Sequence, residues 1–249
     1  MSDHVISEID GGVQTVRIER MDAENRLTAD ICERLADSLS FGESSSRVRA
    51  VLLTGTPGMF VAGHDANELQ GFLTSGGVGE SAIRLLKTLA SIDKPVIAAV
   101  DGPSFGIGTM LLFLCDYVVA SEWSIFSAAA AEMGLPPEGA ASLLAPALIG
   151  YHRAFGLLVM GDEMDATQAL HAGLVNKVVP ADAVDAAGRE AARVLAGKPP
   201  EAVRMHRRLM RGDRLNVLQR IGLEATSFSD LMRSPAARDA LQAYIDANR

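Results

Sequence analysis

Strand-like and helix-like patterns alternate over the first 180 residues, and this order constrains the fold of the chain more than any single motif. Alternating apolar residues on both sides of Gly11-Gly12 predict a β-hairpin. Three β-branched runs predict further strands, and apolar residues at helical spacing lie among them. The strand runs are 48–54, 95–100 and 117–120, and the helical segments are 27–39, 80–91 and 108–114. Such alternation indicates an α/β layered fold.

From residue 181 onward the pattern is helical only. Amphipathic segments cover 181–196, 199–211, 215–232 and 235–247, and no strand pattern remains. We therefore expect an α/β core over residues 1–195 and a C-terminal helical region over residues 196–249. The glycine-rich stretch 71–79 is expected to be a mobile surface loop.

The composition excludes several classes of function. The chain of 249 residues carries 23 Lys and Arg against 31 Asp and Glu, and its net charge of −8 repels a nucleic-acid backbone. The most apolar segment, 106–120, contains Asp116 and is shorter than the ~20 residues of a membrane span. The two cysteines lack zinc or redox spacing, and the N-terminal residues do not form a secretory signal. We expect a cytoplasmic protein without a metal site and without a nucleic-acid or membrane partner.

Two glycine-bearing turns that follow predicted strands are the expected places for chemistry. The first, 54–65, contains Ala62 and Gly63, whose small size leaves the backbone open to a ligand. The second, 101–108, leads through Gly106 into an apolar helix. Each turn could direct backbone N–H groups at an anionic oxygen.

The second turn also imitates a dinucleotide-binding fingerprint, because Gly106 and Gly108 follow a predicted strand. However, Leu111 occupies the third glycine position, and the crossover to residue 117 is shorter than we expect of a full βαβ unit. We therefore do not expect a nicotinamide or flavin cofactor.

Three motifs occur in order between residues 13 and 180. They are Phe60-Val61-Ala62-Gly63-His64-Asp65; residues 94–103 with Gly106-Ile107-Gly108 and Cys115-Asp116; and Ala169-x-x-x-Gly173-Leu174-Val175-Asn176-Lys177-Val178-Val179. As a set they resemble the enoyl-CoA hydratase/isomerase (crotonase) superfamily. The resemblance implies a superhelix of ββα turns followed by C-terminal helices that build trimers or hexamers. This expectation agrees with the α/β core and helical region derived from the patterns.

The resemblance also implies a substrate and a way of binding it. Members of the superfamily bind an acyl-CoA thioester and hold its carbonyl oxygen between two backbone N–H groups, which stabilises an enolate. By position these are the N–H groups of His64 and Ile107, and the small residues Ala62, Gly63 and Gly106 are expected to lie against the CoA thioester. Coenzyme A is part of the substrate, so no separate cofactor is implied.

The carboxylates depart from the pattern of a hydratase. A hydratase of this superfamily places two glutamates across its pocket, and the matching positions here are Met110 and Ala130. Neither side chain accepts a proton, so water addition by that mechanism is not expected. Instead, the turn 134–142 resembles the Pro-Glu-Gly turn of the peroxisomal-type Δ3,Δ2-enoyl-CoA isomerases, whose single catalytic glutamate matches Glu138.

A single base at Glu138 implies an allylic proton shift, a reaction of fatty acid metabolism. Glu138 would remove a C2 proton from a 3-enoyl-CoA and return it to C4, which gives trans-2-enoyl-CoA. An apolar acyl pocket is expected to exclude water from this step, and its residues are Met110, Phe126, Ala130 and Leu135. A purely structural interpretation of Glu138 competes, because an acid after proline commonly opens a helix.

Three alternative functions remain open from the sequence. A hydratase could use an unusual acid, for which Glu132 is the nearest candidate, although an exposed loop acid is the more ordinary interpretation of that residue. The protein could also bind acyl-CoA without catalysis, or carry out another enolate reaction such as thioester hydrolysis or ring chemistry. Other acids at strand and helix ends are interpreted as turn or cap residues, namely Asp65, Asp101 and Asp116.

The helical region carries a basic stripe and an apolar one. The basic stripe consists of Arg204, Arg207, Arg208 and Arg211, and we interpret it as a solvated or interface face rather than as a CoA phosphate site. The apolar stripe consists of Leu215, Leu218, Ile221, Leu231, Leu241 and Ile245. It exceeds what covering one monomer requires, so we expect a homotrimer or hexamer.

Overall fold

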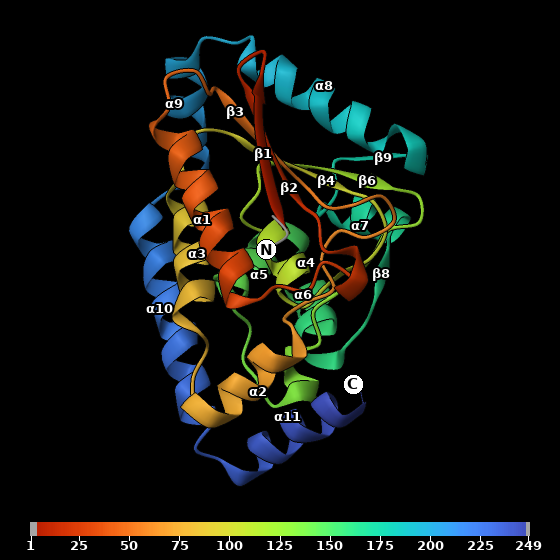
Figure 1. The fold of residues 1–249 in the computed structure, drawn as a ribbon, viewed down its shortest axis with the longest axis vertical. Helices are drawn as coiled ribbons and strands as arrows, with labels where there is room; N and C mark the ends of the chain where they lie inside the picture. The colour runs from red at the N-terminus through yellow and green to blue at the C-terminus, as the bar shows by residue number, and fades with distance from the viewer. Residues whose placement is uncertain (1–3, 248–249) are drawn as a thin grey trace.

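The larger of two β-sheets lies at the centre of the computed structural model, which describes residues 4–247 (Figure 1). Its strand order is β1-β2-β3-β4-β6-β9. The strands are β1 (Val5–Asp10), β2 (Val13–Ile18), β3 (Ala50–Thr54), β4 (Val96–Val100), β6 (Tyr117–Ser121) and β9 (Lys177–Val179). β1 and β2 form the predicted antiparallel hairpin, and the remaining neighbours in this sheet pair in parallel. β3 and β4 are buried on both faces, which explains their continuous apolar sequences.

Side chains of β3 alternate between two layers of the core. Val51 and Leu53 belong to the main apolar cluster, which the helices α1 (Ala29–Ser44) and α3 (Glu80–Ser91) cover. Ala50 and Leu52 point the other way, into a smaller cluster beneath α8 (Val184–Ala196). Figure 1 shows α8 crossing one side of the sheet while α1 and α3 lie on the other. The sheet is therefore the middle layer of an α/β structure.

A second sheet, which the sequence patterns did not predict, begins in the turn after β4. Its strand order is β5-β7-β8, and the strands are β5 (Ser104–Phe105), β7 (Ile125–Ser127) and β8 (Met164–Asp165). Strands of two or three residues are too short to leave an alternating pattern in the sequence. Pairing between Ser104 and Phe126 ties the turn after β4 to a distant segment of the chain.

Two local expectations are wrong. We expected the crossover to residue 117 to be too short for a full βαβ unit. However, β4 pairs in parallel with β6, and the short helix α4 (Ile107–Leu112) lies in the connection between these neighbouring strands. The stretch 71–79 is not all loop, because α2 (Ala66–Ser75) continues through its first half. Burial of Leu69, Phe72 and Leu73 holds this glycine-containing segment helical, and α2 ends at Gly76 with φ +74°.

The predicted C-terminal helices are confirmed. They are α9 (Pro200–Arg211), α10 (Arg214–Leu231) and α11 (Pro235–Ala247), and Figure 1 shows α10 beside α3 and α11 below α2. The remaining helices are α5 (Ala141–Ile149), α6 (Tyr151–Phe155) and α7 (Ala166–Ala172), with a π-helical turn at Gly156–Met160 and 3-10 turns at Met21–Ala23, Ala130–Met133 and Ala181–Ala183. Within residues 4–247, no helix combines the length and apolar character needed to span a bilayer.

The division into a core of residues 1–195 and a helical region of residues 196–249 stays a prediction. The boundary falls at the end of α8, which packs on the sheet, and α9 starts four residues beyond α8. Residues 1–3 and 248–249 of this division lie outside the described range.

Candidate functional site

The two glycine-bearing turns run side by side where β3 and β4 end. Phe105 donates its N–H to the carbonyl oxygen of Val61 at 2.8 Å, and Phe60 donates to Pro103 at 3.1 Å. The chain then reaches Gly63 with φ +100° and Gly106 with φ +53°, in a region of backbone conformation that favours glycine. A Cβ atom on Gly106 would lie 3.7 Å from the Cα of Gly63, so the two turns approach closely at these glycines.

The residues that follow these glycines, His64 and Ile107, carry the N–H groups expected to bind a thioester oxygen. Within residues 4–247, neither backbone N–H donates a hydrogen bond. Ile107 is the first residue of α4, and the first N–H groups of a helix have no partner inside it. Both N–H groups are therefore available to an anionic oxygen.

A cavity of about 330 Å³ lies beside the two turns. It is lined by all of the predicted site residues except Phe126, namely Ala62, Gly63, His64, Gly106, Ile107, Met110, Ala130, Leu135 and Glu138. Phe126 is fully buried in the main core, and Ser127, the next residue of β7, lines the cavity instead. Successive side chains of a strand point to opposite faces, so the prediction chose the wrong neighbour.

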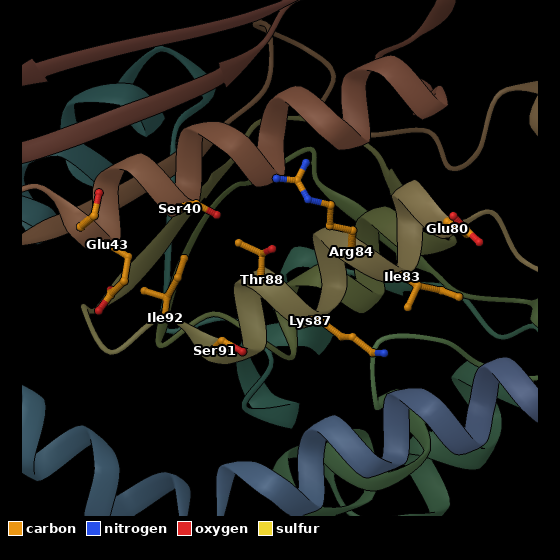
Figure 2. A pocket seen from close by; sticks show the side chains of 10 residues that line it. Ser40, Glu43, Glu80, Ile83, Arg84, Lys87, Thr88, Ser91 and Ile92 are labelled. Carbon is orange, nitrogen blue, oxygen red and sulfur yellow. The ribbon is translucent and has the colours of Figure 1, made fainter.

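A larger hollow of about 590 Å³ lies on the surface between α1 and α3 (Figure 2). In Figure 2 Arg84 points toward α1, where it pairs with Glu33 and Asp37, and Lys87 points away from α1. None of the predicted site residues lines this hollow. The predicted site residues therefore gather at the smaller cavity.

The side chain of Glu138 pairs with the imidazole of His64 inside the cavity. His64 Nε2 lies 2.8 Å from Glu138 Oε1, and the two side chains are 9% and 16% exposed. The second carboxylate oxygen, Oε2, is buried and has no hydrogen-bond partner among the described residues. One oxygen of Glu138 is thus held by His64, and the other accepts no hydrogen bond from residues 4–247.

The motif assigns a role only to the backbone N–H of His64 and none to its imidazole. The ring is nevertheless buried, and it packs edge-on against Phe72 with centroids 5.1 Å apart. Burial lowers the pKa of His64, but the charge of Glu138 and its hydrogen bond raise it, and the net shift is upward from 6.5. The positive form of His64 is therefore stabilised by its partner.

Glu138 does not open a helix. It lies three residues before α5, in a turn where its N–H donates to Met110 Sδ at 3.3 Å and its carbonyl oxygen accepts from Ala141 at 3.2 Å. Because Glu138 precedes the N-cap residue Ala140, its carboxylate does not lie in the first turn of α5, where an acid would interact favourably with the helix dipole. The helix-opening interpretation of Glu138 is consequently wrong.

A second acid, Glu132, lines the same cavity but is exposed. Its carboxylate lies against Gly161, where an added Cβ would come within 2.3 Å of Glu132 Oε1. Sequence reasoning missed other polar residues that line the cavity, including Glu24 and its ion-pair partner Arg26 at 2.8 Å. No motif spacing connects these residues to the glycine turns, so the sequence offered no signal for them.

The other acids have structural roles, as expected. Asp65 caps α2 by accepting from Asn67 N–H at 2.9 Å, and Arg20 pairs with it at 2.7 Å. Burial raises the pKa of Asp65, but the hydrogen bonds from Asn67 and Arg20 lower it, and the net shift is downward. Asp101 and Asp116 each accept a backbone N–H at 2.8 Å, at Gly58 and Val96 respectively.

The basic stripe attaches α9 to the rest of the chain. Arg207 and Arg211 pair with Asp116 at 2.7 and 3.1 Å, and Arg208 pairs with Asp93 at 3.3 Å. Arg204 pairs with Glu201 on its own helix. None of these arginines lines the cavity that holds Glu138.

Comparison with known proteins identifies the family. The enoyl-CoA hydratase/isomerase family model matches residues 8–249. The short-chain-enoyl-CoA hydratase of Clostridium acetobutylicum is 30% identical over 99% of this chain and 96% of its own length. The 1,2-epoxyphenylacetyl-CoA isomerase of Escherichia coli is 29% identical over 98% of this chain and 96% of its own.

Solved structures agree. Pseudomonas aeruginosa OdaA aligns with a TM-score of 0.91 and 34% identity over 98% of this chain and 99% of that chain. An enoyl-CoA hydratase/isomerase from Pseudoalteromonas atlantica aligns with a TM-score of 0.90 and 31% identity over 98% of both chains. The expected fold class, a crotonase-like α/β superhelix with a C-terminal helical region, is confirmed. The chain belongs to the enoyl-CoA hydratase/isomerase family.

Proposed function

We propose that the protein is an enoyl-CoA isomerase that converts a 3-enoyl-CoA to trans-2-enoyl-CoA with Glu138 as the base. One observation carries the proposal: Glu138, whose carboxylate has one oxygen held by His64 and one buried oxygen without a partner among residues 4–247, lines the same cavity as His64 and Ile107, whose backbone N–H groups donate no hydrogen bond within those residues. A base and an oxyanion-binding pair are the two parts that enolate chemistry requires.

The thioester carbonyl oxygen accepts hydrogen bonds from the N–H groups of His64 and Ile107. These donors are fixed by the pairing of the two turns, so they need no rearrangement when negative charge develops on the oxygen. Removal of one such donor typically costs about 10²- to 10³-fold in turnover. The backbone thus supplies the electrostatic part of catalysis.

Proton transfer uses the free oxygen of Glu138. Oε2 takes a proton from C2, and the electrons of that C–H bond form the C1–C2 double bond of a dienolate. Oε2 then delivers the proton to C4, the double bond settles between C2 and C3, and the carbonyl is restored. A carboxylate can only accept, so the His64 nitrogen that faces Oε1 carries a proton and donates it in a hydrogen bond that fixes the carboxylate.

The wall of the cavity disfavours hydration. Met110, Ala130 and Leu135 are buried and present a thioether, a methyl and an isobutyl group. None of these groups can hold or activate a water molecule. Attack of water on C3 of the conjugated trans-2-enoyl product is therefore not promoted, and the product leaves without hydration.

Hydration is nevertheless the main competing reaction, because Glu132 lines the same cavity and one relative is named a short-chain-enoyl-CoA hydratase. A product analysis separates the candidates. Incubation with a 3-enoyl-CoA is expected to yield the conjugated trans-2-enoyl thioester, which absorbs in the ultraviolet, with little 3-hydroxyacyl-CoA. Rapid hydration of a 2-enoyl-CoA would indicate a hydratase. Tight binding of a saturated acyl-CoA with no change in either enoyl substrate would indicate a binding protein.

A further inference from the structure

A buried glutamate on α10 contacts the turn that carries Glu138. Glu224 is only 5% exposed, and its carboxylate accepts three hydrogen bonds. Ala140 N–H donates to Oε2 at 2.6 Å, while Ser142 N–H and Ser142 Oγ donate to Oε1 at 3.0 and 2.6 Å. All three donors follow Glu138 within four residues, so a helix far away in the sequence holds this turn.

The turn depends on such support because its backbone is unusual. Ala140 has φ +61°, in the left-handed region that residues with a Cβ rarely adopt, and Gly139 before it has φ +71°. The hydrogen bond from Ala140 to Glu224 anchors the strained residue directly. Loss of that bond would allow the turn to relax toward ordinary backbone angles, and Glu138 would move with it.

The same face of α10 also supports His64. Phe228 lies one helical turn beyond Glu224 and packs edge-on against Phe72, with ring centroids 5.3 Å apart. Phe72 in turn packs edge-on against the His64 ring at 5.1 Å, and Phe228 itself lines the cavity. One face of α10 therefore reaches both members of the His64–Glu138 pair.

We infer that Glu224 is a positioning residue: through Ala140 and Ser142 it sets the place of the Glu138 carboxylate opposite His64. The catalytic consequence rests on the proposed isomerase function. The negative charge of Glu138 also acts on Glu224. Burial raises the pKa of Glu224, the hydrogen bonds from Ser142 and Ala140 lower it, and the charge of Glu138 raises it, with a net upward shift.

The test compares Glu224→Gln with Glu190→Gln, the same substitution at an exposed position of α8. In Glu224→Gln an amide replaces the carboxylate and turns an NH2 group toward backbone donors, which breaks part of the network without changing side-chain size. We expect kcat for a 3-enoyl-CoA to fall about 10- to 100-fold, because small displacements of a catalytic group have effects of that order. The affinity for a saturated acyl-CoA should not change, and Glu190→Gln should behave as wild type.

Two further measurements separate positioning from general destabilisation. In a Glu138→Gln background, Glu224→Gln should cause no further loss of turnover, because both act through one carboxylate. The 15N NMR signal of His64 Nε2 should shift in Glu224→Gln, which reports the His64–Glu138 contact without any turnover. A shifted signal in a protein that lacks isomerase activity would support the positioning and refute the proposed function.

The inference is overturned if folded Glu224→Gln keeps the wild-type His64 signal and kcat, or if its loss of kcat is undiminished in the Glu138→Gln background. If Glu224→Gln does not fold, Ser142→Ala replaces it, since this change removes the Ser142 hydroxyl from the network. A smaller shift of the His64 signal and a smaller fall in kcat are then expected. Wild-type values of both in Ser142→Ala would also overturn the inference.

Discussion

In the proposed mechanism His64 contributes two groups: a backbone N–H for the substrate oxygen and an imidazole that contacts Glu138. The motif that contains His64 predicted the first role, because that role depends only on the main chain. The second role depends on a contact across 74 residues of sequence, and no local pattern reports it. His64 and Glu138 were each identified as site residues, but the hydrogen bond between them required the fold.

The pair predicts a pH dependence of stability. The folded state raises the pKa of His64 above 6.5, so the stabilising contribution of the charged imidazole is full below pH 6.5 and is lost as the pH rises through the folded-state pKa. His64→Gln should therefore lower the free energy of unfolding more at pH 6 than at pH 9. Urea unfolding of both proteins at the two pH values measures the difference. His171→Gln, at an exposed position of α7, is the control, and a penalty for His64→Gln that is constant or grows with pH would contradict the account.

At the scale of elements, helices with a clear apolar face were located well from the sequence, and α3 has the predicted bounds. The sequence did not predict the extent of α2, because the glycine-rich composition of its second half is typical of a loop. It did not predict β5, β7 and β8 either, because these strands have only two or three residues. These short strands position the turn before α4. The motif resemblance therefore pointed to the two glycine-bearing turns, whereas the pairing that aligns them became visible only in the structure.

The contact between α4 and the first turn gives a prediction about Gly108. A Cβ on this residue would lie 2.5 Å from the carbonyl oxygen of Val61, so Gly108→Ala must push the two glycine-bearing turns apart. We expect a loss of about 1–3 kcal/mol in stability, as for other overpacked sites. Turnover should fall as well, because the N–H groups of His64 and Ile107 would separate.

Gly71→Ala on α2 is the matched control, because no atom lies within 4 Å of the added Cβ. Alanine is the better helix former, so this variant should be neutral or more stable by up to about 1 kcal/mol. Thermal unfolding and turnover of both variants provide the comparison. Equal effects of the two substitutions would show that the contact with Val61 does not matter.

At the scale of the whole molecule, the apolar stripe of the helical region contains both buried and exposed residues. Ile221, Leu241 and Ile245 are buried within the chain, so they cover its own core rather than a partner. Leu215 is 61% exposed and Leu231 is 39% exposed. Helical spacing alone could not distinguish these groups, because it identifies an apolar face without showing what covers it. Further large apolar side chains are exposed on α5, α6 and α9, including Leu148, Tyr151, Phe155, Leu209 and Met210.

These exposed apolar residues favour assembly, and we retain the prediction of a homotrimer or hexamer. Light scattering at micromolar concentration should give three or six times the chain mass of 26.3 kDa. Replacement of Leu209 and Met210 by serine is a second test. If these exposed side chains lie between subunits, the substitutions should lower the mass measured by light scattering, whereas on a monomer they should leave it unchanged. A monomeric mass for the wild-type chain would contradict the prediction.

The central claim is that Glu138 is the base, and turnover of a 3-enoyl-CoA by Glu138→Gln tests it most directly. Glutamine keeps the size of the side chain and an oxygen that can accept from His64, but it cannot take a proton from C2. Glu132→Gln is the matched control in the same cavity. We predict that Glu138→Gln lowers turnover by about 10²- to 10⁴-fold and leaves the affinity for a saturated acyl-CoA unchanged, while Glu132→Gln remains active. Turnover above about one tenth of the wild-type value in folded Glu138→Gln would contradict the account and make Glu132 the next candidate.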